Sequence, residues 1–239
     1  MKALFGFVFS CAAAMAQPGI SAPPVGAFLD SAGVVHSVSG LPGNLLCSPA
    51  GLPAGVSFAF FGSAGLLKTD TQVIAFDANF NVTAQFDAPP GPALFASPSL
   101  VYYPASGDLV RLDSKQTVAL PQHLLAISLL DNSARLSAVM RRGHTLLRVS
   151  IDATTGTIES EAPVDVTGPM LIMPAGTLVF LRNGRLNAGD RSVPVDFTVA
   201  NFELAGASAA AIATNDGRHF VLHLSGGSIE LSQIPEVTQ

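Results

Sequence analysis

Four aspartates in polar turns are the first residues of this 239-residue sequence that could do chemistry. Asp30, Asp70, Asp108 and Asp216 each stand between two short apolar segments. Carboxylate oxygens are among the ligands that Ca²⁺ prefers. If the fold brings these turns together, the four side chains could share a calcium ion.

A short basic cluster offers a second kind of chemistry. Arg141, Arg142 and His144 lie within four residues of one another. The histidine could act as a general base on an anionic substrate that the two guanidinium groups attract. A solvated loop of the same composition is the alternative interpretation.

Other catalytic signatures are missing from the sequence. There is no G-x-S-x-G elbow and no Gly-rich phosphate loop, and Cys47 has no histidine near it in sequence. His219 and His223 stand four residues apart on an expected strand, which separates their Cα atoms by about 13 Å. That distance is too long for one zinc ion with bonds of about 2.1 Å.

The elements that must position these residues recur at even spacing. Strand-like segments end in polar corners at Ser39, Asp77, Asp113, Asp152, Asp190 and Ser225. Successive corners are 38, 36, 39, 38 and 35 residues apart. Most of these segments have a strand-like partner before and after them and a fourth strand ahead of the unit. Such a period is typical of four-stranded propeller blades.

By this period and strand pattern, the chain resembles β-propeller proteins over residues 26–237. The six units predict an all-β fold, a six-bladed β-propeller of four-stranded antiparallel blades. A β-sandwich or another all-β repeat fold is the alternative. The first unit lacks an obvious innermost strand, so either residues 17–24 or the C-terminal segment "SIELSQIPEV" is expected to complete it. There is no WD dipeptide or kelch signature, so no family's functional residues carry over.

In a propeller, the turns between second and third strands gather at one face around the central channel. We therefore predict that a binding site lies at this rim. The predicted binding rim comprises Asp30, Asp70, Asp108, Arg141, Arg142, His144, Asn215, Asp216 and Arg218. Six-bladed propeller lactonases hold calcium at the channel mouth, so the resemblance implies calcium as the one cofactor to consider, with no metal ligand assigned. Hairpin tips are also polar wherever they occur, which is the alternative explanation.

The N-terminal segment "MKALFGFVFSCAAAMAQ" predicts export. It has a lysine, an apolar run and an A-x-A site that ends at Ala16. We expect residues 1–16 to be a signal peptide, residues 17–25 a flexible tether, and the mature protein to be periplasmic or secreted. Lipidation of Cys11 is a minor alternative.

Composition narrows the possible partners. Removing the leader takes Lys2 with it and leaves 11 basic against 17 acidic residues, a net charge of −6. That balance argues against a nucleic-acid partner, and no segment after residue 16 resembles a membrane span. The favoured function is a non-enzymatic binding module that recognises a protein or glycan through the rim. A calcium-dependent propeller hydrolase or lactonase and a structural component of an envelope assembly are the alternatives.

Overall fold

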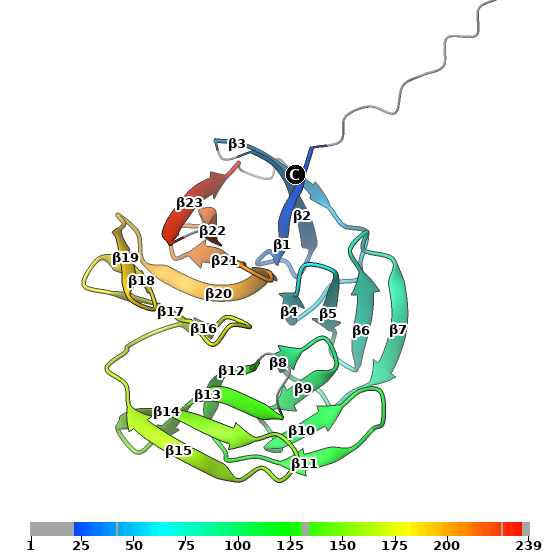
Figure 1. Ribbon diagram of the computed structural model, residues 1–239. Coiled ribbons are helices and arrows are strands. Elements are labelled where there is room, and N and C mark those ends of the chain that lie inside the picture. The colour runs from blue at the N-terminus through cyan, green and yellow to red at the C-terminus, as the bar shows by residue number, and fades with distance from the viewer. Residues whose placement is uncertain (1–21, 42, 131–133, 226, 236–239) are drawn as a thin grey trace, which may run out of the picture.

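The computed structural model describes residues 22–41, 43–130, 134–225 and 227–235 (Figure 1). The predicted signal peptide, Cys11 and residues 17–21 of the predicted tether lie outside these ranges. The described residues form strands and turns, and none of them forms a helix. Among them, no helix is therefore long and apolar enough to cross a membrane.

Most strands belong to short antiparallel sheets that follow one another along the chain. The first sheet contains β1 (Pro24–Leu29), β2 (Val35–Leu41) and β3 (Asn44–Pro49). Three four-stranded sheets contain β8 (Leu94–Ser97), β9 (Leu100–Tyr103), β10 (Asp108–Arg111) and β11 (Thr117–Ala119); β12 (Leu124–Leu129), β13 (Arg135–Arg142), β14 (Thr145–Asp152) and β15 (Ile158–Pro163); and β16 (Met170–Ile172), β17 (Leu178–Arg182), β18 (Arg185–Ala188) and β19 (Arg191–Pro194).

The remaining eight strands form one larger sheet with two halves. One half contains β4 (Ser57–Phe60), β5 (Ala64–Lys68), β6 (Gln72–Asp77) and β7 (Val82–Asp87), and the other contains β20 (Val199–Gly206), β21 (Ala209–Thr214), β22 (His219–Ser225) and β23 (Ser228–Ile234). Each half is antiparallel throughout. The two halves meet where β4 and β20 run parallel and pair at Ala59 and Leu204.

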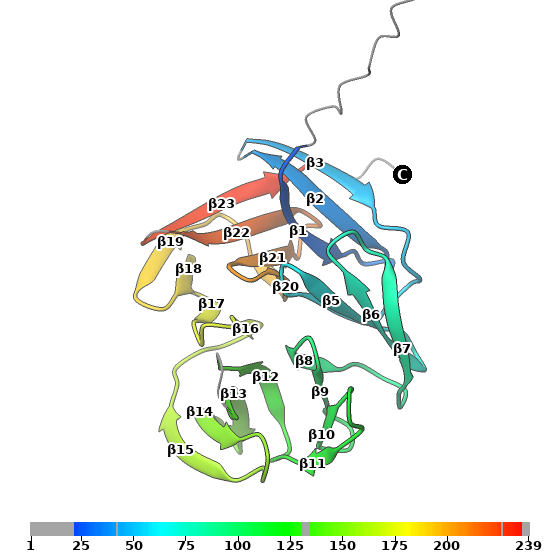
Figure 2. The same cartoon turned by 45° about the vertical axis from the view of Figure 1, so that its right-hand side comes forward.

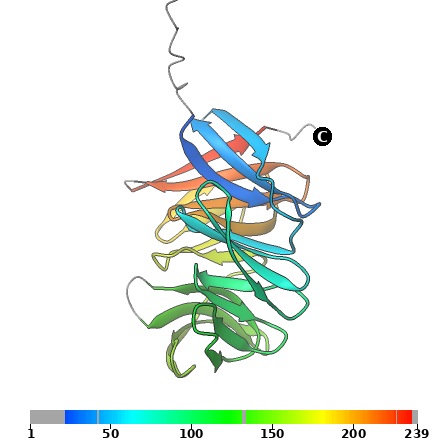
Figure 3. The same cartoon turned by 90° about the vertical axis from the view of Figure 1, so that its right-hand side faces the viewer.

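The sheets are arranged around a common centre. Figure 1 shows β4, β8, β16 and β20 towards that centre, with β7, β11, β15 and β19 on the outside. The side view in Figure 3 places the first and last sheets next to each other at one end. The first and last units of the chain are therefore neighbours, as Figure 2 also shows.

Burial follows the position of a strand in its sheet. All four residues of β9 are buried, whereas the outer strand β15 is exposed along most of its length. A strand that is covered on both faces has a continuous run of hydrophobic residues. A strand with one face exposed to solvent also carries polar residues. This difference explains why the predicted inner strands are apolar and the predicted outer strands are polar.

The structure confirms one local prediction and departs from three others. The corner after Asp77 joins β6 to β7, as the repeat predicted. The expectation of four strands in every unit is wrong for the first sheet, which has three. The C-terminal segment does not complete that sheet, because β23 pairs with β22. β1 begins at Pro24, so the last two residues of the predicted tether are part of a strand.

The first sheet packs closely on the last one at Gly26. A Cβ atom at this position would lie 2.4 Å from the carbonyl oxygen of Ala205 in β20. Phe28 and Val38 of the first sheet share a buried cluster with Ala211 and Val221. A glycine is therefore required where β1 crosses β20.

Candidate binding site at the rim and in the central cavity

Backbone hydrogen bonds hold two sets of loops together at one end of the sheets. In four units, a backbone N–H of the segment that follows the outer strand donates to a turn between the second and third strands of the same unit. The donors and acceptors are Gly55 to Gly33, Ala88 to Thr71, Leu120 to Gly107 and Val195 to Gly184, at N···O distances of 2.8 to 2.9 Å. The linking segments and the turns of the predicted rim therefore share one face of the molecule.

Asp30 fixes the turn between β1 and β2. Its Oδ1 accepts hydrogen bonds from the backbone N–H groups of Ala32 and Val34 at 2.9 and 2.8 Å, and its Oδ2 lies 2.9 Å from Nε2 of His36. Burial works against ionisation, but the bonds from Val34 and His36 outweigh it and hold the pKa of Asp30 below its usual value. Both carboxylate oxygens of Asp30 are therefore used in hydrogen bonds within its own hairpin.

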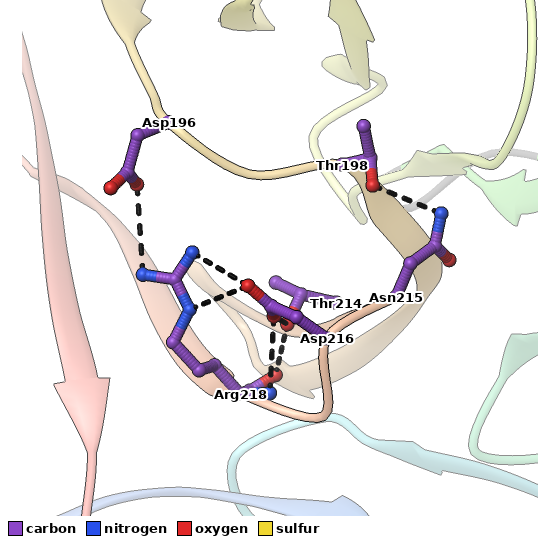
Figure 4. A network of polar contacts seen from close by, with 6 residues as sticks. All are labelled: Asp196, Thr198, Thr214, Asn215, Asp216 and Arg218. Atoms are coloured by element: carbon purple, nitrogen blue, oxygen red, sulfur yellow. Dashed lines mark hydrogen bonds and ion pairs between the residues drawn. The ribbon is translucent and has the colours of Figure 1, made fainter.

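Asp216 and Arg218 form a tight pair in the turn between β21 and β22 (Figure 4). Nε and Nη2 of Arg218 donate to Oδ2 of Asp216 at 2.9 and 2.8 Å. The hydroxyl of Thr214 also donates to the Asp216 carboxylate. The bonds from Arg218 and then from Thr214 lower the pKa of Asp216, so this carboxylate stays ionised at neutral pH.

The same turn is attached to the segment that leads into β20. The backbone N–H and the side-chain amide of Asn215 bond to the carbonyl and the hydroxyl of Thr198, both at 3.0 Å. The Arg218 guanidinium lies 5.5 and 5.8 Å from the ring centroids of Phe220 and Phe197. Asn215 and Arg218 thus fix a turn against the start of an inner strand.

The other predicted rim residues make fewer side-chain contacts. Asp70 and His144 are exposed at turns, and Arg141 is exposed near the end of β13. Arg142 is also exposed and forms an ion pair with Glu161, with Nη2 2.8 Å from Oε2. Asp108 is half-buried as the first residue of β10.

The four aspartates that could have shared a calcium ion do not form a ligand group. In the part of the chain that the structure describes, no three His, Cys, Asp or Glu side chains lie close enough to hold a metal ion. Asp30 and Asp216 are instead bound to His36 and Arg218.

A central cavity of about 290 Å³ opens beside the rim. Its lining comes from β4, β8, β12, β16 and β20 and from the residues that precede them. Val56, Pro92 and Asn201 are the exposed lining residues, and each lies at or near the start of its inner strand. The linking segments enter the inner strands from the rim, so the mouth of the cavity is on the rim side.

Glu203 in β20 is the one ionisable side chain among the described residues that line this cavity. Its Oε2 accepts a hydrogen bond from the backbone N–H of Leu29 at 2.9 Å, and its Oε1 accepts one from Nδ2 of Asn201 at 3.3 Å. Burial raises the pKa of Glu203 to about 7, and the nearby charge of Asp30 adds to the rise, whereas the bond from Leu29 opposes it. Functional sites often contain a carboxyl group whose pKa is raised and which lines a cavity.

A buried aromatic and polar cluster adjoins Leu29 and Asp30. The ring of Phe28 lies 5.2 Å from that of His36 and 4.8 Å from that of His219. His36 is 2% exposed, and its Nδ1 has no hydrogen-bond partner among the described residues. Burial lowers the pKa of His219.

Sequence reasoning missed Glu203 as a site residue. Its signal was present, because Glu203 is the one charged residue of the strand-like segment "TVANFEL". The pattern showed that it interrupts an apolar strand. Its contact with Leu29, 174 residues away, is not visible in the local sequence.

Comparisons with known proteins find the fold in solved structures. PorZ of Porphyromonas gingivalis, described as an essential bacterial surface component of the type-IX secretion system, is 14% identical with a TM-score of 0.53; the match covers 91% of this chain and 39% of PorZ. The β-propeller domain of Cps50 (Swd1) from Myceliophteria thermophila is 13% identical with a TM-score of 0.46, over 76% of this chain and 72% of that domain.

The WD40 β-propeller domain of Doa1 is also similar, at 11% identity and a TM-score of 0.45, over 82% of this chain and 88% of that one. No family model and no curated protein matches the sequence. At 14% identity, the similarity to PorZ shows the fold and nothing finer. Because its short antiparallel sheets follow one another around a common centre, the chain is a β-propeller repeat protein.

Proposed function

We propose that the chain is an exported, non-enzymatic β-propeller that binds a partner protein or a glycan through its rim. The observation that carries this proposal is that some charged rim residues stabilise their own turns while others are free to contact a partner. Asp30, Asp216 and Arg218 hold their turns in place, while other charged side chains at the same face stay exposed. A surface that is already ordered loses little conformational entropy on binding.

The exposed part of the rim sets the chemistry of the partner. Asp70 is acidic, whereas Arg141, Arg142 and His144 are basic or can become so, and all four are exposed. Loops on a rigid scaffold are common recognition surfaces. The signal peptide predicted for residues 1–16 supports export, and the net charge of the mature chain disfavours nucleic acid as the partner.

A matched pair of variants tests the rim. The rim variant carries Asp70→Ala, Arg141→Ala and His144→Ala, and the control variant carries Lys115→Ala and Asp190→Ala at exposed corners between third and fourth strands. Binding of each purified protein is measured on a glycan array and by crosslinking to an envelope fraction of the host. We expect the rim variant to lose the captured ligand and the control to keep it. Equal capture by both variants contradicts the proposal, as does the absence of saturable capture by the wild type.

We also infer that the ring has six blades. Six antiparallel units follow one another along the chain, and the first of them counts as a blade that lacks its innermost strand. Its place is between the halves of the large sheet, where β1 packs on β20 through Gly26.

The calcium-dependent hydrolase remains the competing function, and a thermal melt separates the two. A non-enzymatic module without calcium should melt at the same midpoint with added calcium and with excess chelator. Calcium at 100 times its dissociation constant would add about 2.7 kcal/mol to the unfolding free energy. For a chain of this size that corresponds to roughly 5–10 °C. A shift of this size would put a calcium ion in the folded ring and direct attention to lactone and ester substrates, whereas no shift would contradict the calcium-dependent hydrolase.

A further inference from the structure

We propose that the central cavity binds a small organic cation, an ammonium or guanidinium group on an apolar body, with Glu203 as its counter-ion. This site is distinct from the exposed rim side chains and does not require a protein partner.

The size and walls of the cavity suit a small ligand with both an apolar and a polar part. Its volume of about 290 Å³ is close to the lower limit of the ~300–1,000 Å³ range of small-molecule sites. Most of its lining side chains are apolar, including Leu125, Ile127, Met170 and Leu171. Burial of apolar ligand surface against such walls contributes about 25 cal/mol per Å².

The charge of the site selects a cation. Within the described part of the chain, Glu203 forms no ion pair, and the two hydrogen bonds that it accepts come from the neutral N–H groups of Leu29 and Asn201. A carboxylate in a site of low dielectric constant without a cationic partner is poorly stabilised. A ligand with a positive charge would supply that partner, whereas an anionic ligand would be repelled.

Other lining groups favour a nitrogen cation with N–H donors. Phe61 is a partly buried lining residue, and a phenyl ring next to a cation adds cation–π attraction. The side-chain amide of Asn201 stands at the exposed mouth and donates its N–H to Glu203. Its oxygen is a second acceptor for an entering ammonium or guanidinium group.

The raised pKa of Glu203 fits the same picture. Burial first and then the charge of Asp30 raise it to about 7, so in the empty site near neutral pH the carboxyl is partly protonated. A bound cation would favour the ionised form and bring the pKa down. The other titratable groups packed near Asp30 are His36 and His219, and both flank the ring of Phe28.

The test is calorimetric titration of the purified chain at pH 8 with cyclohexylammonium, and with cyclohexanol as the neutral analogue. We expect saturable one-to-one binding of the ammonium and at least tenfold weaker binding of the alcohol. A peptide with a single lysine, compared with its acetylated form, shows whether the cation can also come from a side chain. Failure of every cationic probe to bind, or equal affinity for ammonium and alcohol, would overturn the proposal.

Three variants assign the binding to this cavity. Glu203→Gln keeps an oxygen that can accept from Leu29 and should weaken ammonium binding at least tenfold, whereas Glu230→Gln on the exposed outer strand should leave it unchanged. Leu125→Trp adds bulk to a half-buried wall residue and should weaken binding without altering the charge. Unchanged binding in Glu203→Gln overturns the assignment. The rim variant should keep cation binding, so failure of the rim proposal and failure of this one are separable.

Discussion

Glu203 makes stability depend on pH in a direction opposite to that of most carboxyl groups. Its pKa is raised from 4.5 to about 7 in the folded chain. Between these values the folded state holds the proton and the unfolded state releases it, so the free energy of unfolding falls as pH rises through this window. Each pKa unit of difference corresponds to at most about 1.4 kcal/mol. The opposite trend is expected from Asp30, whose lowered pKa contributes stability only above the acidic range.

The variant Glu203→Gln isolates this effect. We expect it to be more stable than the wild type at pH 8, because it removes a buried negative charge, and to lose this advantage near pH 5. Urea denaturation at both pH values measures the difference. A constant difference across the range would show that the Glu203 carboxyl does not titrate within it.

Lys68 is a second residue whose role was not visible in the sequence. Its side chain is fully buried, and its Nζ donates to the backbone carbonyls of Thr69 and Asp70 at 2.6 and 2.9 Å. We expect Lys68→Met to lower the free energy of unfolding by about 1–3 kcal/mol, because a charged donor to two carbonyls is lost. Lys115→Met at an exposed corner is the control and should stay within about 0.5 kcal/mol. Equal unfolding midpoints of the two variants would contradict this role.

At the scale of elements, the contact between β1 and β20 depends on the absence of a side chain at Gly26. A Cβ there would meet the carbonyl oxygen of Ala205 at 2.4 Å and its Cβ at 3.2 Å. Gly26→Ala should therefore destabilise the chain by about 1–3 kcal/mol, the usual cost of overpacking. Chemical denaturation measures it. Adding Ala205→Gly should not restore stability, because the closer clash is with the backbone; full rescue would show that the methyl group of Ala205 is the obstacle.

The elements were predictable wherever local sequence determines them. The corner after Asp77 was expected from an Asx turn, and the structure shows its Oδ1 accepting from the N–H groups of Asn79 and Asn81. The period also located the third strands that end at Asp152 and Ser225. The sequence showed that the first unit lacks an obvious innermost strand, but not that β4 pairs with β20, because Ala59 and Leu204 are 145 residues apart.

The candidate site was predictable only in part for a related reason. Residue type and position placed Asp30 and Asp216 in turns, and both lie there. Whether such a carboxylate is free or occupied depends on neighbours such as His36 and Arg218, whose side-chain directions are set by the folded hairpin. Glu203 stood out as an acid in an apolar strand, but the cavity around it is formed by five strands distant in sequence.

For the whole molecule, the decisive question is whether the first sheet is part of the ring or an addition to a ring that β4 and β20 already close. The parallel pairing of these strands at Ala59 and Leu204 would permit closure without the first sheet. Against this, the first sheet covers Ala205, Ala209 and Val221, which are 0%, 2% and 3% exposed.

We expect a chain that begins at Gly51 to lose cooperative unfolding, because it exposes this apolar surface and removes the hydrogen bond from Leu29 to Glu203. Thermal melts followed by circular dichroism, compared with the chain from residue 17, provide the measurement. Adding the separate segment 22–50 in trans should restore part of the transition if its only role is to cover β20 and β21. A cooperative melt of the shortened chain alone, near the midpoint of the longer one, would mean that five units form the closed ring and that the six-bladed assignment is wrong.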